Sequence, residues 1–232
     1  MKSSLYLLLG SLVLNACTIN IPVDSGSVYY SKNTSKDQKN LKTQPMVIKS
    51  FSVGDFSKVE ASAAMRFFIK KADENRVEIN SNAMEYIEVT NHHQMLNVKY
   101  KTDKELVNLR TEVTVYMKDL QNLEASAAAL VVVKDTFNSE KLSVDLNSAS
   151  QLIGNLSAKT LNIEISSAAK LNANIECQTL DIEATSSSYS RLSGNAEKVK
   201  AEASTAAKID LKNLKYQNIK TETFSSGKVI KS

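Results

Sequence analysis

The chain has 232 residues and a formal net charge of +4, with two cysteines, two prolines, six glycines and no tryptophan. The charge is small and evenly spread, so the sequence gives no support for a nucleic-acid partner. If an N-terminal lipid occupies one cysteine, the other has no partner, and no disulfide framework can form within a monomer.

The first residues are typical of a secretory signal. Lys2 precedes an apolar run over residues 5–14, which is too short to cross a hydrocarbon core of about 30 Å as a helix. The run ends in LNAC, which resembles the lipobox of bacterial lipoproteins. The resemblance implies a signal peptide over residues 1–16, a lipid on Cys17 and a membrane as partner. Because residue 18 is Thr and not Asp, it further implies the outer membrane. An ordinary cleaved signal with a chance cysteine is the alternative.

Residues 17–47 are polar and rich in lysine. Such a stretch buries too little apolar area to offset the entropy of ordering it. We therefore predict a flexible tether that begins at the lipidated Cys17. The remaining residues, 48–232, are predicted to form one domain.

An acidic residue recurs in this domain at intervals of 21, 19, 19, 19 and 20 residues. The series comprises Glu124, Asp145, Glu164, Glu183, Glu202 and Glu222. Each acid is followed within a few positions by a cluster of Ser, Ala and Thr residues, and an earlier copy of the pattern stands at residues 59–64. A fixed period of this length is typical of a repeat architecture in which each copy is one structural unit.

Within each copy, apolar and polar residues alternate, as from Leu161 through Ile163 and Ile165 to Leu171 and Ile175. Period two predicts strands with one buried face. We therefore predict an all-β fold, a parallel β-helix or β-solenoid, with coils of about 19 residues stacked about 4.8 Å apart. Right-handed winding is expected because parallel crossovers are right-handed. A β-sandwich is the alternative, and the scarcity of Gly and Pro argues against its many turns.

Residues 51–120 alternate less regularly and are predicted to form longer strands of the first coils, which cap the N-terminal end of the solenoid. The last coil ends near residues 227–230 without an evident cap. An open end of this kind is available to the tether, to another molecule or to end-to-end self-association.

The domain resembles the GIN-type head domain of putative autotransporter adhesins. The likeness rests on FSVGDFSKVEASAAMRFFIKK from Phe51, on the VEI and LNVKY segments and on the tandem copies, and it covers residues 48–232. It implies a parallel β-helix-like fold and a place in the bacterial cell envelope. The Ser-Gly corners of the family are mostly Ala or Ser here, and only Ser226-Gly227 keeps the glycine.

If the coils are in register, the six carboxylates form one column and are the candidate binding face. Neighbouring carboxylates then repel each other by about 1 kcal/mol in water. Outward lysines (Lys170, Lys200, Lys208, Lys220 and Lys228), bound cations or a basic partner could offset this repulsion. A solvated face of mixed charge is the simpler reading. No metal and no cofactor are assigned, because the alternating Asp and Gly of calcium-binding coils are absent.

Other reactive residues are better explained by structure. His92 and His93 are adjacent and are expected in a surface turn, Cys177 is expected to fill the core, and no G-x-S-x-G elbow occurs. We therefore expect a non-enzymatic protein, lipid-anchored in the envelope, that presents a surface for adhesion or for binding envelope or extracellular molecules. A periplasmic scaffold, a lipid or small-molecule carrier and, less favoured, a carbohydrate-active β-helix enzyme are the alternatives. The sequence leaves the surface and periplasmic sides of the membrane open.

Overall fold

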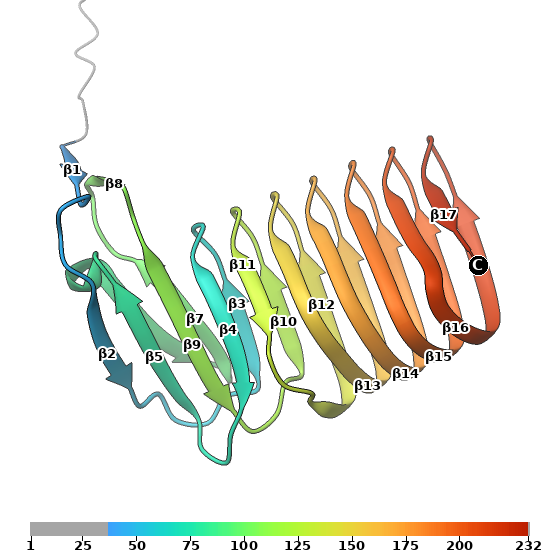
Figure 1. Ribbon diagram of the computed structural model, residues 1–232, viewed down its shortest axis with the longest axis horizontal. Coiled ribbons are helices and arrows are strands. Elements are labelled where there is room, and N and C mark those ends of the chain that lie inside the picture. The colour runs from blue at the N-terminus through green and yellow to red at the C-terminus, as the bar shows by residue number, and fades with distance from the viewer. Residues whose placement is uncertain (1–36, 232) are drawn as a thin grey trace, which may run out of the picture. The chain divides into compact units, whose positions relative to one another are not determined.

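The computed structural model of the protein describes residues 37–231 and is all-β over that range (Figure 1). The predicted signal peptide, Cys17 and the predicted tether up to residue 36 lie outside the described residues. The strands are β1 (Gln38–Asn40), β2 (Val47–Phe51), β3 (Lys58–Ala61), β4 (Arg66–Lys71), β5 (Arg76–Ser81), β6 (Ile87–His92), β7 (Met95–Tyr100), β8 (Glu105–Val107), β9 (Thr111–Met117), β10 (Asn122–Ala125), β11 (Leu130–Val133), β12 (Asn138–Leu146), β13 (Gln151–Ile165), β14 (Lys170–Ala184), β15 (Tyr189–Ala203), β16 (Lys208–Thr223) and β17 (Lys228–Ile230). A single 3₁₀ turn, η1, spans Met84–Tyr86. The predicted β-solenoid is confirmed.

Each coil is flat and has one tight corner and one wider bend. In β14, Leu171 and Ile175 are buried on one side of the coil and face inward, as do Leu180 and Ile182 on the other. Between the two sides, Gln178 and Thr179 are both exposed, so the alternation of inner and outer residues shifts phase at the bend. The sequence analysis did not foresee this shift. The strand before a corner and the strand after it therefore lie on opposite sides of the coil, and we call these sides the pre-corner face and the post-corner face.

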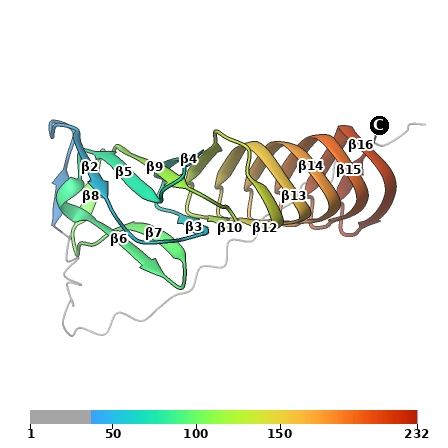
Figure 2. The same ribbon diagram turned by 90° about the horizontal axis from the view of Figure 1, so that it is seen from below.

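The coils stack in parallel and in register on both faces (Figure 2). The post-corner face runs from β4 through β11 into the first halves of β13, β14, β15 and β16. The pre-corner face runs from β3 through β10 and β12 into the second halves of the same long strands. Inward side chains of the two faces meet in one continuous core.

Departures from the 19-residue period have local causes. The longer first interval reflects residues 134–137, which join β11 to β12 outside any strand. The 20-residue interval reflects a bulge, because the register between β15 and β16 shifts between Arg191 and Ser193. Before and after each insertion, the apolar side chains of the strands still point into the core.

Every corner contains two successive residues in the left-handed region of backbone conformation. These pairs are Ala63 and Ala64, Ala127 and Ala128, Ser148 and Ala149, Ser167 and Ala168, Ser186 and Ser187, Thr205 and Ala206, and Ser225 and Ser226. Residues with a Cβ atom adopt this region at a cost of about 1 to 3 kcal/mol each unless the surroundings hold them there. Residues other than glycine thus occupy these corners, and each corner still has the left-handed backbone conformation.

Backbone hydrogen bonds between corners hold this conformation. The N–H of Ala168 donates to the carbonyl of Ser186 at 3.0 Å, and the N–H of Ser187 donates to that of Thr205 at 3.0 Å. Equivalent bonds join the other neighbouring corners, from Ala64 to Ala206. Each corner is therefore fixed by the next coil, which explains how small residues other than glycine can occupy it.

The N-terminal end is closed by a cap, as predicted, but the cap strands are not coils of the solenoid. β2 pairs antiparallel with β5, β5 with β9, and β6 with β7. The chain leaves the first coil after β4, builds the cap and returns at β10, which pairs with β3. The prediction of solenoid strands over residues 51–120 is correct for β3 and β4, which form the first coil. It is wrong for β2, β5 and β6, which pair antiparallel, because alternation specifies a half-buried strand but not the direction of its neighbour.

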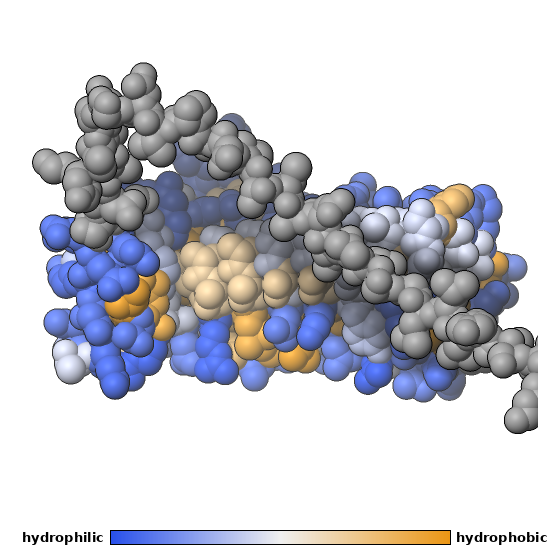
Figure 3. Space-filling view, turned by 90° about the horizontal axis from the view of Figure 1, so that it is seen from above, coloured by the Kyte–Doolittle hydropathy of each residue, from blue (hydrophilic) through white to orange (hydrophobic). Residues whose placement is uncertain are grey.

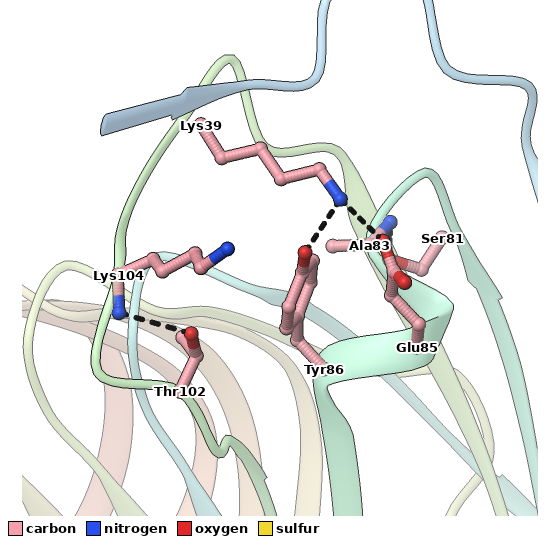
Figure 4. Close-up of polar contacts among 7 residues, drawn as sticks. All are labelled: Lys39, Ser81, Ala83, Glu85, Tyr86, Thr102 and Lys104. Atoms are coloured by element: carbon pink, nitrogen blue, oxygen red, sulfur yellow. Dashed lines mark hydrogen bonds and ion pairs between the residues drawn. The ribbon is translucent and has the colours of Figure 1, made fainter. Parts of the chain in front are cut away.

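The packed domain begins before residue 48. Leu41 is fully buried, and β1 pairs with β8. The Nζ of Lys39 donates to Glu85 Oε1 at 2.8 Å and to the Tyr86 hydroxyl at 2.6 Å (Figure 4). These contacts place β1 and Leu41 in the cap, within the stretch for which the sequence predicted a tether.

At the C-terminal end, β17 pairs only with Lys208–Asp210 of β16. Within residues 37–231, the rest of the outer edge of β16 has no strand beside it. Val229 and Ile219 of this last coil are only partly buried. The end that the sequence analysis expected to be open is open in the described part of the chain.

Candidate binding surfaces

The pre-corner face carries the acidic column that the repeats predicted. Strand pairing aligns Glu124 with Asp145, Asp145 with Glu164, and each later acid with the next as far as Glu222. Glu60 of β3 pairs with Glu124 and extends the column by one residue into the first coil. Whether this column binds anything stays a prediction.

In the first coils, asparagine side chains donate hydrogen bonds to the acidic side chains of the column. Asn97 donates to Glu60 at 2.6 Å, Asn122 to Glu124 at 2.9 Å, and Asn147 to Asp145 at 3.2 Å. In the last coil the ammonium of Lys220 lies 2.8 Å from Glu222 and lowers the pKa of that carboxyl. In the middle coils the acids at 164 and 183 are exposed to solvent, which screens their repulsion.

The lysines expected to offset this column divide between the two faces. Lys200 and Lys220 lie on the pre-corner face, and Lys200 is 3.7 Å from Asp181. Lys170, Lys208 and Lys228 stand at the starts of their strands, directly after a corner, and so lie on the post-corner face. The prediction is wrong for these three because the corner separates them from the acids.

The post-corner face is correspondingly basic and aromatic. Its cations include Arg66, Lys70, Lys71, Lys134, Lys170, Arg191, Lys208, Lys212 and Lys228, and its acids include Glu176 and Asp210; β9 and β5 continue the same sheet beyond β4 and add Glu112, Arg76 and Glu78. Aromatic rings alternate with them: Arg76 lies 4.0 Å from the Tyr116 ring centre, and Lys134 lies 5.3 Å from that of Phe68. A modest net charge therefore conceals two faces of opposite sign.

The corners form an exposed ridge between the two faces. Seen from above, the ridge is apolar along one stretch and becomes nearly neutral in hydropathy farther along (Figure 3). The change follows the corner residues, which are Ala63, Ala64, Ala127 and Ala128 in the first coils and mainly Ser or Thr in the last ones.

A groove of ≈ 710 Å³ runs across five coils at the bends. Its floor consists of small side chains apart from Tyr216 at one end, and its two walls consist of polar ones. The floor is Ser139, Ala158, Cys177, Ala196 and Tyr216; one wall is Asn138, Ser157, Glu176, Asn195 and Lys215; the other is Glu140, Lys159, Gln178, Glu197 and Gln217. Register pairing aligns the floor and the first wall from coil to coil, and each residue of the second wall directly follows a floor residue.

Contacts within the groove link neighbouring coils. The amide of Asn195 donates to Glu176 at 2.8 Å, and the ammonium of Lys159 lies 2.8 Å from Glu140. The remaining wall groups face solvent and offer hydrogen-bond donors and acceptors at the coil spacing of about 4.8 Å. The groove therefore suits a ligand that extends along the solenoid axis.

Cys177 and the two histidines have structural positions. Cys177 is 8% exposed, as expected for a core residue, and burial raises the pKa of its thiol to about 11, so it is a poor nucleophile at neutral pH. His92 and His93 are exposed at the turn between β6 and β7. Among residues 37–231, no three His, Cys, Asp or Glu side chains gather closely enough to hold a metal ion.

The groove and the basic face were not predicted, although the sequence carries signals for both. Ala158, Cys177 and Ala196 recur at the 19-residue period, as do Lys170, Tyr189 and Lys208. The predicted face rested on the acidic series alone. Because the phase shift at the bend was not predicted, the column of small residues could not be distinguished from ordinary core residues.

Over residues 37–231, these features define an all-β repeat protein with two long open faces and a groove along one edge of the stack. Residues 55–230 match the family described as "Putative auto-transporter adhesin, head GIN domain", and the protein belongs to this family. The resemblance drawn from the sequence is confirmed in this respect. Comparison with curated proteins gives no match.

Solved structures share the fold at low sequence identity. A putative lipid binding protein from Parabacteroides distasonis superposes with a TM-score of 0.68 at 11% identity, covering 84% of this chain and 100% of that one. A putative adhesin from Bacteroides fragilis gives 0.64 at 15% identity, with 84% and 99% covered. A putative adhesin from Parabacteroides merdae gives 0.56 at 14% identity, with the same coverage.

Within residues 37–231, no helix is long and apolar enough to pass through a bilayer.

Proposed function

We propose that this protein is a non-enzymatic adhesion module, held by a lipid on Cys17 in the outer membrane, that binds an extended polymer of the envelope or the extracellular surroundings. The observation that carries the proposal is the groove, which crosses five coils and has polar walls and a floor of mainly small side chains. Ligand sites are typically concave and present a few polar groups that fix orientation. Membership of a family of putative adhesins supports the same function.

The groove carboxylates do not resemble a hydrolytic pair. Glycoside hydrolysis requires one carboxyl group held protonated beside a second carboxylate. Here Glu176 accepts a hydrogen bond from Asn195, Glu140 is paired with Lys159, and both carboxylates belong to exposed residues. Both carboxylates therefore already have a partner inside the groove, which favours binding of a ligand over its hydrolysis.

Filling the groove should abolish ligand capture. We expect Asn195→Trp to reduce retention at least about ten-fold, because the indole would occupy the space between the walls. The measurement uses the full chain carrying Cys17→Ser on arrays of bacterial polysaccharides, mucin glycans and extracellular-matrix proteins. Asn162→Trp is the matched control, since it makes the same replacement on the pre-corner face. Unchanged capture by the Asn195 variant would contradict the proposed site.

The anchor has a separate test. Replacement of Cys17 by Ser should move the protein from the membrane fraction to the soluble fraction, because the acyl chains that hold it can no longer be attached. Fractionation of cells expressing each form, followed by immunoblotting, measures this. A Cys17→Ser protein that still sediments with membranes would show that the anchor is wrong. Protease treatment of intact and lysed cells then distinguishes the outer surface from the periplasm.

A carrier of lipid or small molecules is the second candidate. One similar structure is that of a putative lipid binding protein, although at 11% identity it supports the shared fold alone. The described interior is packed with apolar side chains, so a lipid would have to lie on a face or in the groove. Mass spectrometry of organic extracts of the purified protein would detect it. End-to-end self-association through the open edge of β16 also remains a prediction.

A further inference from the structure

We propose a second binding site, distinct from the groove, for acidic polysaccharide on the post-corner face around Tyr189. Tyr189 lies on β15 between Lys170 of the preceding coil and Lys208 of the following coil, with which it is paired in register. Lys208 lies 5.5 Å from the centre of the tyrosine ring, and Arg191 lies 5.6 Å from it. Two cations thus lie against one partly exposed aromatic ring, and a third, Lys170, occupies the same register position in the preceding coil.

A hollow adjoins this ring. It has a volume of ≈ 220 Å³ and is lined by Tyr189, Arg191, Lys170, Asn172 and Ile153, together with the strand residues between them. The hollow is smaller than typical pockets for drug-sized ligands, which begin at about 300 Å³. It therefore suits one ring of a longer molecule. The exposed side chain of Ile153 and the tyrosine ring offer apolar contact to the C–H face of a sugar.

The charges of the site are not balanced within the described protein. Asp210 is the acid nearest to it in register, opposite Arg191, and is already engaged. Its carboxylate lies 3.7 Å from the Nε of Arg191 and accepts a hydrogen bond of 3.4 Å from the hydroxyl of Tyr189. Within residues 37–231, Lys170 and Lys208 form no ion pair within 4.0 Å. A guanidinium has five donors, so the contact of Arg191 with Asp210 leaves others for a ligand.

The arrangement selects an acidic polysaccharide over other anions. Lys170 and Lys208 are two coils apart, about 9.6 Å, which is comparable with the advance of two residues of an extended sugar chain. Carboxylates of uronate residues would pair with Lys170, Arg191 and Lys208 while one ring stacks on Tyr189. A flat bilayer could reach the lysines but would leave the hollow unfilled. The other aromatic–cation pairs of this face, at Phe68 and Tyr116, do not line this hollow.

The test measures binding of the full Cys17→Ser chain to polygalacturonate, with neutral dextran as the reference polymer. We expect binding to polygalacturonate alone, weakening as salt is raised. The double variant Lys170→Gln, Lys208→Gln should weaken it at least about ten-fold, and Tyr189→Ala by a similar factor. The matched control, Lys200→Gln with Lys220→Gln, removes the same charge from the pre-corner face and should bind as the parent does. Circular dichroism checks that each variant is folded.

Several results would overturn the proposal. Equal binding to dextran would show that binding does not depend on the charge of the polymer. An equal loss of binding in the Lys200→Gln, Lys220→Gln control would show that binding does not depend on the post-corner face. Binding to phosphatidylglycerol vesicles but not to polygalacturonate would assign the cations to lipid headgroups instead. Because the groove is a separate site, Asn195→Trp should leave polygalacturonate binding intact. Loss of binding in that variant would place the acidic polymer in the groove and not at Tyr189.

Discussion

Replacement of Ile163 by Asp is expected to unfold the solenoid. Ile163 is 1% exposed and lies in the second half of β13, where it is paired in register with Val144 and Ile182. A carboxylate at this position would be buried without a partner, in a core made of aliphatic side chains. We expect a loss of about 4 kcal/mol or more in the free energy of unfolding, measured by urea denaturation followed by circular dichroism.

The same strand provides the control. Ile153 is 45% exposed on the outer side of β13, so Ile153→Asp makes an identical chemical change in solvent. Its effect should stay within about 1 kcal/mol. If Ile163→Asp were as stable as Ile153→Asp, the assignment of inner and outer residues on this strand would be incorrect.

The second large effect is expected at Gly194. This residue has a φ of +101°, and a Cβ atom placed on it would lie 2.1 Å from the carbonyl oxygen of Ile175 in the preceding coil. Relief of that overlap requires the two coils to separate, and an L-residue with this φ is itself strained. Gly194→Ala should therefore lower the free energy of unfolding by about 2 to 5 kcal/mol.

Thermal unfolding of Gly194→Ala beside Ser193→Ala separates this steric effect from a general sensitivity of the strand. Ser193 makes one exposed hydrogen bond, to Asn174 at 3.3 Å, and its loss should have an effect of about 1 kcal/mol or less. Similar melting temperatures for the two variants would mean that the coils can separate locally at little cost.

The stacked architecture could be predicted from the sequence because the same types of residue recur at a fixed spacing. The acids at 145, 164 and 183 have the same spacing as their coils, so the series gave the register directly. The copy at residues 59–64 was recognised, but Glu60 was left out of the acidic series because the cap strands, inserted between it and Glu124, lengthen that interval to 64 residues.

The cap, the start of the domain and the charge of the two faces could not be predicted from alternation and the acidic series. Alternation does not state whether a neighbouring strand is parallel, so the cap was taken for coils. Leu41 is a single buried residue in a polar stretch, and the boundary of the domain was therefore placed too late. The charge separation between faces depends on which side of a corner each lysine occupies, and the prediction did not assign the two sides of a corner to different faces.

The likeness of successive corners allows the number of coils to change in evolution. Because each corner donates its hydrogen bond to the next corner in the same way, a duplicated stretch of 19 residues could enter the stack between β13 and β14 without disturbing either neighbour. An unequal crossover between two copies would lengthen or shorten the protein by one whole coil. Related strains could thus carry alleles that differ in how many ligand units the molecule spans, with the chemistry at each step unchanged.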